Sequence, residues 1–208
     1  EQGVLSLQTQ ASSGDFERYV EPVLPLDESL RAIFADQPAL FIQNVTQVPM
    51  FPTTAQLAQA IWERESGQRV NGVIAVDPVT LAYLLEATGP ITLPTGDVVT
   101  AENAVSLLLN EVYLRYEDPA LQDAFFQATA AAVFDAVARG SADPGALIDA
   151  LRRATGEHRI LVWNENENEQ VVLDGTALQG LLPPTDADRT AFGVYPVSYT
   201  HLTLPTSD

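Results

Sequence analysis

The chain has 208 residues, of which 28 are acidic and ten are basic, all of them arginine, so its formal net charge is −18. A nucleic acid partner requires a basic surface and is therefore excluded, and anionic lipid headgroups are repelled by the same charge. The absence of cysteine excludes disulfides, thiol nucleophiles and thiolate metal sites. The hydrophobic fraction of 46% is sufficient for a folded core. No apolar run reaches the ~18 residues of a membrane span, so we expect no direct membrane insertion.

Both ends of the chain indicate a fragment. The sequence begins at Glu1 and carries no signal-peptide pattern, so we expect the native protein to continue upstream. Residues 197–206 read VSYTHLTLPT, which resembles the translated reading frame of a transposon sequencing adapter. We therefore expect residues 197–208 to be a non-native tail and residues 1–196 to form a single domain, truncated at both ends.

The N-terminal third predicts a strand, two helices and a short apolar segment. Residues 3–10 alternate in hydrophobicity as a strand does, and residues 27–35 read as a short helix. Residues 39–45 are predicted to be a short strand or a buried loop. A clearer helix is predicted from Thr53, with Gln56 completing a capping box and Gly67 as its stop.

The middle of the chain alternates strands and helices. Residues 70–76, VNGVIAV, are almost wholly apolar and predict a strand buried on both faces. Asp-Pro pairs then begin three predicted helices, because aspartate is a good N-cap and proline suits the first helical turn. These pairs start at Asp77, Asp118 and Asp143. Residues 91–99 predict a small hairpin, and Thr100 is the expected cap of another helix.

The C-terminal part predicts a further hairpin. Residues 159–163, RILVW, read as a strand, residues 164–169, NENENE, as a solvated turn, and the segment from Val171 as the returning strand. Another strand is expected near Val194. Because strands and helices alternate through the middle, the sequence predicts an α/β fold, a layered domain with a central mixed sheet and helices on both faces.

Two residues are candidates for chemistry. Asp77 directly follows a predicted strand, where ligands gather in open sheets, although its pattern equally fits a helix N-cap. Arg115 could hold a phosphate bidentately, or it could complement the helix dipole with Glu111 as its partner. A serine hydrolase would depend on His158, the only histidine before the tail, and the sequence has no G-x-S-x-G elbow.

Four motifs carry a resemblance to a known family. They are FPTTAQLA from Phe51, GVIAVDP from Gly72, LLEATGPI from Leu84 and DAFF from Asp123. In these motifs, and from about Gly3 to Tyr195, the chain resembles a bacterial family of unknown function, DUF 4012. The resemblance implies a cell-envelope protein with an upstream membrane anchor and this domain outside the cell. It offers no catalytic residues to carry over.

The order of elements is more distantly similar to that of LytR-CpsA-Psr phosphotransferases. Those enzymes transfer glycopolymers from a lipid pyrophosphate carrier to the cell wall, with arginines on the pyrophosphate and acidic residues on magnesium. Arg115 matches the first arginine of their R-x-R pattern, but Glu117 occupies the second position, and the following ALQDAFF contains no arginine. This implies a similar fold without the cationic site.

The sequence therefore predicts a non-catalytic domain at the cell surface, which binds a cell-wall polymer or an envelope protein or has a structural role. No cofactor is expected in that case. The alternative is an active phosphotransferase of the LytR-CpsA-Psr type, in which Arg115 contacts phosphate, Asp77 is an acidic site residue and magnesium is the cofactor.

Overall fold

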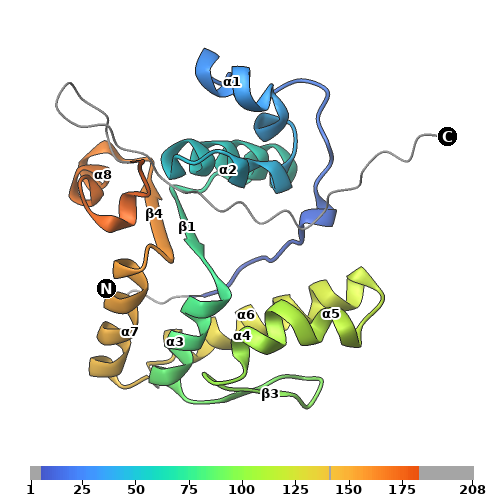
Figure 1. The fold of residues 1–208 in the computed structure, drawn as a ribbon, viewed down its shortest axis with the longest axis vertical. Helices are drawn as coiled ribbons and strands as arrows, with labels where there is room; N and C mark the ends of the chain where they lie inside the picture. Colours follow the sequence, from blue (N-terminus) through green and yellow to red (C-terminus); the bar gives the residue numbers. More distant parts are fainter. Residues whose placement is uncertain (1–5, 141, 183–208) are drawn as a thin grey trace. The chain divides into compact units, whose positions relative to one another are not determined.

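The computed structural model describes residues 6–140 and 142–182. The described chain divides into two compact units, one of residues 18–69 with 180–182 and the other of residues 6–17 with 70–140 and 142–179. We call them the helical unit and the sheet-containing unit and describe each by itself (Figure 1). The single domain predicted over residues 1–196 stays a prediction, and the predicted tail from residue 197 and the strand near Val194 lie outside the described residues.

The described residues of the helical unit form two α-helices and two short 3-10 helices. Its elements are α1 (Glu28–Phe34), η2 (Gln37–Ala39), η3 (Ile42–Gln47) and α2 (Phe51–Ser66). The side chain of Asp27 caps α1 by accepting a hydrogen bond from the Leu30 N–H at 2.9 Å, which confirms the predicted helix. The predicted strand or buried loop over residues 39–45 is largely 3-10 helix.

The helix α2 forms the centre of this unit. It begins at Phe51 rather than at Thr53, because Pro52 lies in the first turn and supplies a preset helical φ. Leu57 and Ile61 are fully buried on its inner face. The buried Thr54 hydroxyl lies 3.0 and 3.1 Å from the Val45 and Val48 carbonyl oxygens and ties α2 to the preceding segment. Gly67 ends the helix in the left-handed conformation, as predicted.

The sheet-containing unit combines two small antiparallel sheets with several helices. In chain order, its elements are η1 (Ser13–Asp15), β1 (Gly72–Val76), α3 (Pro78–Thr88), β2 (Ile91–Thr92), β3 (Val98–Val99), α4 (Ala104–Ser106), the π-helical η4 (Leu107–Glu111), α5 (Val112–Arg115), α6 (Pro119–Ala138), α7 (Pro144–Gly156), β4 (Ile160–Asn164), α8 (Glu167–Leu173) and η5 (Ala177–Gln179). The described chain is 57% helical.

The predicted α/β class is therefore confirmed only as a mixture of helix and strand. In the described residues β1 pairs with β4, and β2 pairs with β3, each antiparallel, and the layered central mixed sheet is not found. The strand β1 is present where predicted but is not buried on both faces, since Ile74 is 66% and Val76 is 52% exposed. An apolar run predicts a strand but does not give the number of its neighbours, and β1 has one.

Two further predicted strands are absent from the described residues. Residues 6–10 form no strand. The segment predicted as a polar turn and returning strand is instead the helix α8, which Asn166 caps by accepting a hydrogen bond from the Asn168 N–H. Glu167 and Glu169 in its first turn stabilise the helix through its dipole.

The main core of this unit lies between α3, the β2–β3 hairpin, the helical segment from α4 to α5, and α6 (Figure 1). Its buried members are Ala82, Leu85, Ile91, Leu93, Val99, Ala104, Leu107, Leu108, Val112, Phe125 and Val133. A smaller cluster of Tyr83, Ala150, Ala154 and Ile160 joins α3 and α7 to β4. All three Asp-Pro helices begin where predicted, with each aspartate side chain accepting a backbone hydrogen bond.

Candidate functional site

Asp77 has two roles in the structure, one for each carboxylate oxygen. Its Oδ1 accepts hydrogen bonds from the Thr80 N–H at 2.7 Å and from the Thr80 hydroxyl at 2.9 Å, which caps α3. Its Oδ2 accepts a hydrogen bond from Nη1 of Arg159 at 2.7 Å. The register explains this ion pair, because Val76 is opposite Ile160 and the next residues outward are Asp77 and Arg159.

Arg159 belongs to a larger group of charged and polar side chains, which we call the Asp77 cluster: Asp77, Tyr83, Arg153, Glu157 and Arg159. The Arg159 Nε donates to Glu157 at 2.5 Å, and the Tyr83 hydroxyl donates to the same carboxylate oxygen at 2.9 Å. The Arg153 guanidinium lies 3.8 Å from the centre of the Tyr83 ring and 3.5 Å from Glu157. The cluster thus joins the start of α3, the end of α7 and the start of β4.

The pKa values in the cluster reflect this pairing. Hydrogen bonds from Arg159 and Tyr83 lower the pKa of Glu157. Burial, and then the hydrogen bond to Glu157, raise the pKa of Tyr83, and the two carboxylates raise that of Arg159. At neutral pH the cluster holds two carboxylates and two guanidinium groups, so it has no surplus cation with which to bind a phosphate.

Arg115 lies elsewhere in the sheet-containing unit, in the last turn of α5. Its Nη1 donates to Asp97 of the β2–β3 hairpin at 2.6 Å, and the two side chains are 39% and 23% exposed. The predicted partner, Glu111, instead accepts a hydrogen bond from the Ser106 hydroxyl at 2.9 Å. The prediction of a helix-surface pair was therefore wrong, because the hairpin brings a closer carboxylate to the end of α5.

Asp97 accepts a second side-chain hydrogen bond besides the one from Arg115. The Thr95 hydroxyl donates to its Oδ2 at 2.7 Å, and this bond together with that from Arg115 lowers the Asp97 pKa. The two sequence candidates therefore belong to separate ion pairs, Asp77 with Arg159 and Arg115 with Asp97.

His158, on which a serine hydrolase would depend, lies in a tight turn. Its φ is 56°, a left-handed conformation that is uncommon outside glycine, and its N–H donates to the Thr155 carbonyl at 3.0 Å. The turn places Glu157 and Arg159 in the Asp77 cluster. Sequence reasoning missed these two residues and Arg153. The signal that could have found Arg159 is its place as the first residue of the predicted strand over residues 159–163, because Asp77 directly follows the predicted strand over residues 70–76.

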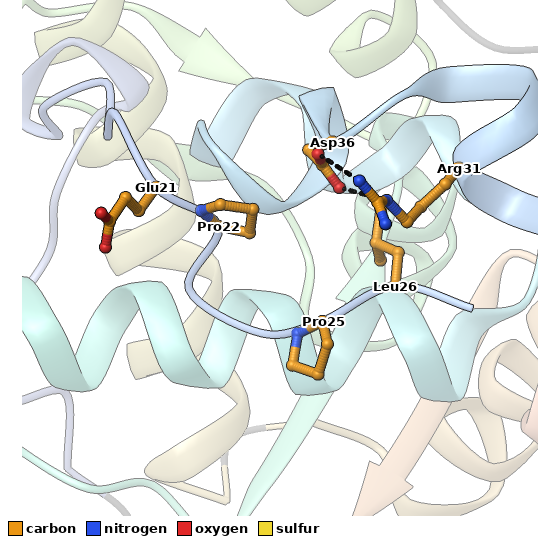
Figure 2. A pocket seen from close by; sticks show the side chains of 6 residues that line it. All are labelled: Glu21, Pro22, Pro25, Leu26, Arg31 and Asp36. Carbon is orange, nitrogen blue, oxygen red and sulfur yellow. Dashed lines mark hydrogen bonds and ion pairs between the residues drawn. The ribbon is translucent and has the colours of Figure 1, made fainter. Parts of the chain in front are cut away.

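Each unit also has a surface groove. In the helical unit a groove of about 460 Å³ is lined by Glu21, Pro22, Pro25, Leu26, Arg31 and Asp36. Figure 2 shows the two proline rings between Glu21 at one end and the Arg31–Asp36 pair at the other. Arg31 holds Asp36 by two hydrogen bonds of 2.9 and 3.2 Å, so both charges are already satisfied. In the sheet-containing unit a groove of about 420 Å³ lies between residues 9–13 and α6.

The described residues contain no group of three or more His, Asp or Glu side chains placed to hold a metal ion. None of the helices within residues 6–140 and 142–182 has the length and apolar character needed to cross a bilayer.

The chain is thus a protein of mixed helix and strand. Its two candidate residues, Asp77 and Arg115, are held in intramolecular ion pairs. Residues 1–113, more than half of the chain, match the family model described as "Protein of unknown function (DUF4012)", and the chain belongs to this family. No curated protein and no solved structure matches the chain.

Proposed function

We propose that the chain is a non-catalytic interaction domain of a cell-envelope protein, held outside the membrane by an anchor in upstream polypeptide. The proposal rests on the ion pairs that the two candidate residues, Asp77 and Arg115, form within the chain. Asp77 caps a helix and pairs with Arg159, and Arg115 pairs with Asp97. Each charge that chemistry would need already has an intramolecular partner of opposite sign.

The charge of the chain indicates which partner is favoured. With a net charge of −18, the surface repels polyanionic wall polymers and attracts basic protein surfaces. Complementary potentials accelerate association and select against like-charged partners. We therefore favour an envelope protein with a basic surface over a wall polymer.

The alternative, a LytR-CpsA-Psr-like phosphotransferase, would require Arg115 to bind a pyrophosphate. The pyrophosphate would have to displace Asp97 from Arg115 at 2.6 Å, and the released carboxylate would then face the anion. Coulomb repulsion between close like charges disfavours this exchange. Glu117, at the position of the second arginine, adds a further negative charge.

Titration with farnesyl pyrophosphate by calorimetry, with and without magnesium, tests the proposal. We expect no saturable binding, and the same result for Arg115→Ala. A matched control is Arg139→Ala, which also removes one guanidinium from a surface ion pair, with Asp135. Saturable binding that Arg115→Ala abolishes and Arg139→Ala retains would establish the phosphotransferase site instead.

A second arm tests the choice of partner. Purified wall sacculi, sedimented with the protein at low and at physiological salt, should leave it in the supernatant. Saturable co-sedimentation at physiological salt would show that the domain recognises the polymer.

A further inference from the structure

The groove of about 420 Å³ in the sheet-containing unit has two walls. One wall is the segment of residues 9–13, and the other is the face of α6 that carries Asp123, Phe126, Gln127 and Ala130. All of these residues are described and belong to the same unit, so the groove is formed within one unit. Its volume lies near the lower end of the ~300–1,000 Å³ of ligand sites, which suits one long side chain.

Hydrogen bonds hold the wall of residues 9–13 in place. The Gln10 Nε2 donates to the Gln127 carbonyl oxygen of α6 at 3.0 Å, which ties the two walls together. The Ser12 N–H donates to the Asp15 Oδ2 at 2.6 Å, and the Gly14 N–H donates to the Ser12 hydroxyl at 3.2 Å, so the turn that follows the wall is closed. A wall that is ordered before a ligand arrives loses little conformational entropy on binding.

Asp123 gives the groove its charge, and it is half-buried. Within residues 6–140 and 142–182 it forms no hydrogen bond or ion pair, whereas Asp77, Asp97 and Glu157 each bond to an arginine. The groove lining contains no arginine, and the chain has no lysine. A carboxylate that is partly withdrawn from water without a cation beside it is stabilised by a cation that a ligand brings.

Phe126 supplies the aromatic part of the groove. It follows Asp123 by three residues on α6, so the two side chains are neighbours on the helix surface. Its ring centre lies 5.7 Å from that of Tyr113, which is 47% exposed. Aromatic rings attract cations, and the arginine guanidinium is the cation that both stacks on a ring and donates two parallel hydrogen bonds to a carboxylate.

We propose that this groove binds an arginine side chain from a basic segment of the partner protein, with the guanidinium on Asp123 and the side-chain stem against Phe126. Charge selects this occupant, because the carboxylate and the net charge of −18 repel an anionic ligand and attract a basic one. A neutral sugar would leave the Asp123 charge without a counter-ion. The inference rests on the proposed function, since it locates the site at which the domain recognises a basic envelope protein.

NMR titration of the isotope-labelled full chain with a blocked peptide that has one arginine among alanines, at low and at physiological salt, tests the proposal. The peptide should bind saturably and shift the amide signals of residues 9–13 and 123–130 most, and the same peptide with glutamine for arginine should not bind. Asp123→Asn should raise the dissociation constant about tenfold, as for the loss of a hydrogen bond to a charged group. Asp135→Asn, the matched control, removes the same charge from α6 outside the groove and should bind like the wild type.

A second variant tests the aromatic contact. Phe126→Leu keeps an apolar side chain and should raise the dissociation constant about two- to fivefold, as for the loss of an exposed cation–π contact, with an unchanged far-UV circular dichroism spectrum. No binding of the arginine peptide at either salt concentration would overturn the proposal, as would equal weakening in Asp123→Asn and Asp135→Asn, which would show attraction by overall charge alone. Either result leaves the proposed function to its own pyrophosphate and sacculus experiments, which do not involve this groove.

Discussion

Asp77 and Arg159 face each other one residue beyond the last paired residues of β1 and β4, and their side chains meet at 2.7 Å. The same aspartate caps α3 through its other oxygen. One carboxylate thus fixes the start of a helix and the end of a sheet. The two effects are separable by mutation.

The first prediction separates the cap of Asp77 from its ion pair. Asp77→Asn keeps an oxygen for the Thr80 N–H and loses the charge opposite Arg159, whereas Asp77→Ala loses both. N-cap removal costs about 1 kcal/mol, so the alanine variant should have the lower free energy of unfolding by roughly that amount in urea denaturation. Asp118→Ala, which removes the cap of α6, should cost a similar amount. Equal stability of the two Asp77 variants would show that the cap contributes nothing.

The second prediction concerns the close approach of β1 to β4 at Gly72. A Cβ at this position would lie 2.9 Å from the Trp163 carbonyl oxygen, closer than real Cβ atoms come to backbone. Gly72→Ala should therefore separate the strands locally and lower the melting temperature. Gly156→Ala is the control, because the space around Gly156 is open, and alanine is the better helix former. A melting temperature unchanged in Gly72→Ala would contradict the close approach.

The third prediction tests the buried hydroxyl of Thr54. Thr54→Val keeps the shape but removes the hydroxyl that bonds to the Val45 and Val48 carbonyls, which should cost about 1–3 kcal/mol of unfolding free energy. Thr54→Ser keeps the donor and should cost less. Chemical denaturation of the two variants measures the difference, and a valine variant as stable as the serine variant would refute the role of the hydrogen bond.

The fourth prediction is a pH dependence centred on Asp97. Its pKa is lowered in the folded state, so its contribution to stability is present above its ordinary value of 3.8 and is lost as the pH falls through the folded value. Carboxyl carbon NMR titration should give a low pKa for Asp97 and a higher one in Thr95→Ala. The pKa of Asp27, which is lowered by Ser29 instead, is the internal control and should stay the same. An Asp97 pKa that Thr95→Ala leaves unchanged would exclude the hydroxyl as its cause.

Much of the local structure could be predicted because single residues determine it. Each Asp-Pro pair begins a helix and Gly67 ends one, since capping and left-handed backbone are properties of one or two residues. The segment 164–173 was predicted as a turn and a returning strand, but residues 167–173 form the helix α8. Alternating Asn and Glu residues fit a solvent-exposed hairpin turn as well as the N-cap and first turn of a helix. The layered central sheet is not confirmed in the described residues, since the hydrophobicity of GVIAV does not indicate how many strands lie beside it.

The candidate site could be predicted less well than the helices. Asp77 was recognisable as a cap, but its pairing with Arg159, 82 residues further along the chain, depends on the register between β1 and β4. Arg115 was assigned to Glu111 by helix spacing, although a hairpin outside the helix supplies the nearer carboxylate, Asp97. Long-range pairing of this kind follows from tertiary packing and not from local sequence.

The π-helical turn over Leu107–Glu111 determines the direction in which Arg115 points. A π turn contains about one residue more than an α-helical turn, and each residue of an α-helix rotates the next by roughly 100°. In an uninterrupted α-helix without that additional residue, everything after Glu111 would be turned by about this angle, and Arg115 would no longer face Asp97. We therefore expect a single deletion within residues 107–111 to turn Arg115 away from Asp97 and to break the ion pair between α5 and the β2–β3 hairpin.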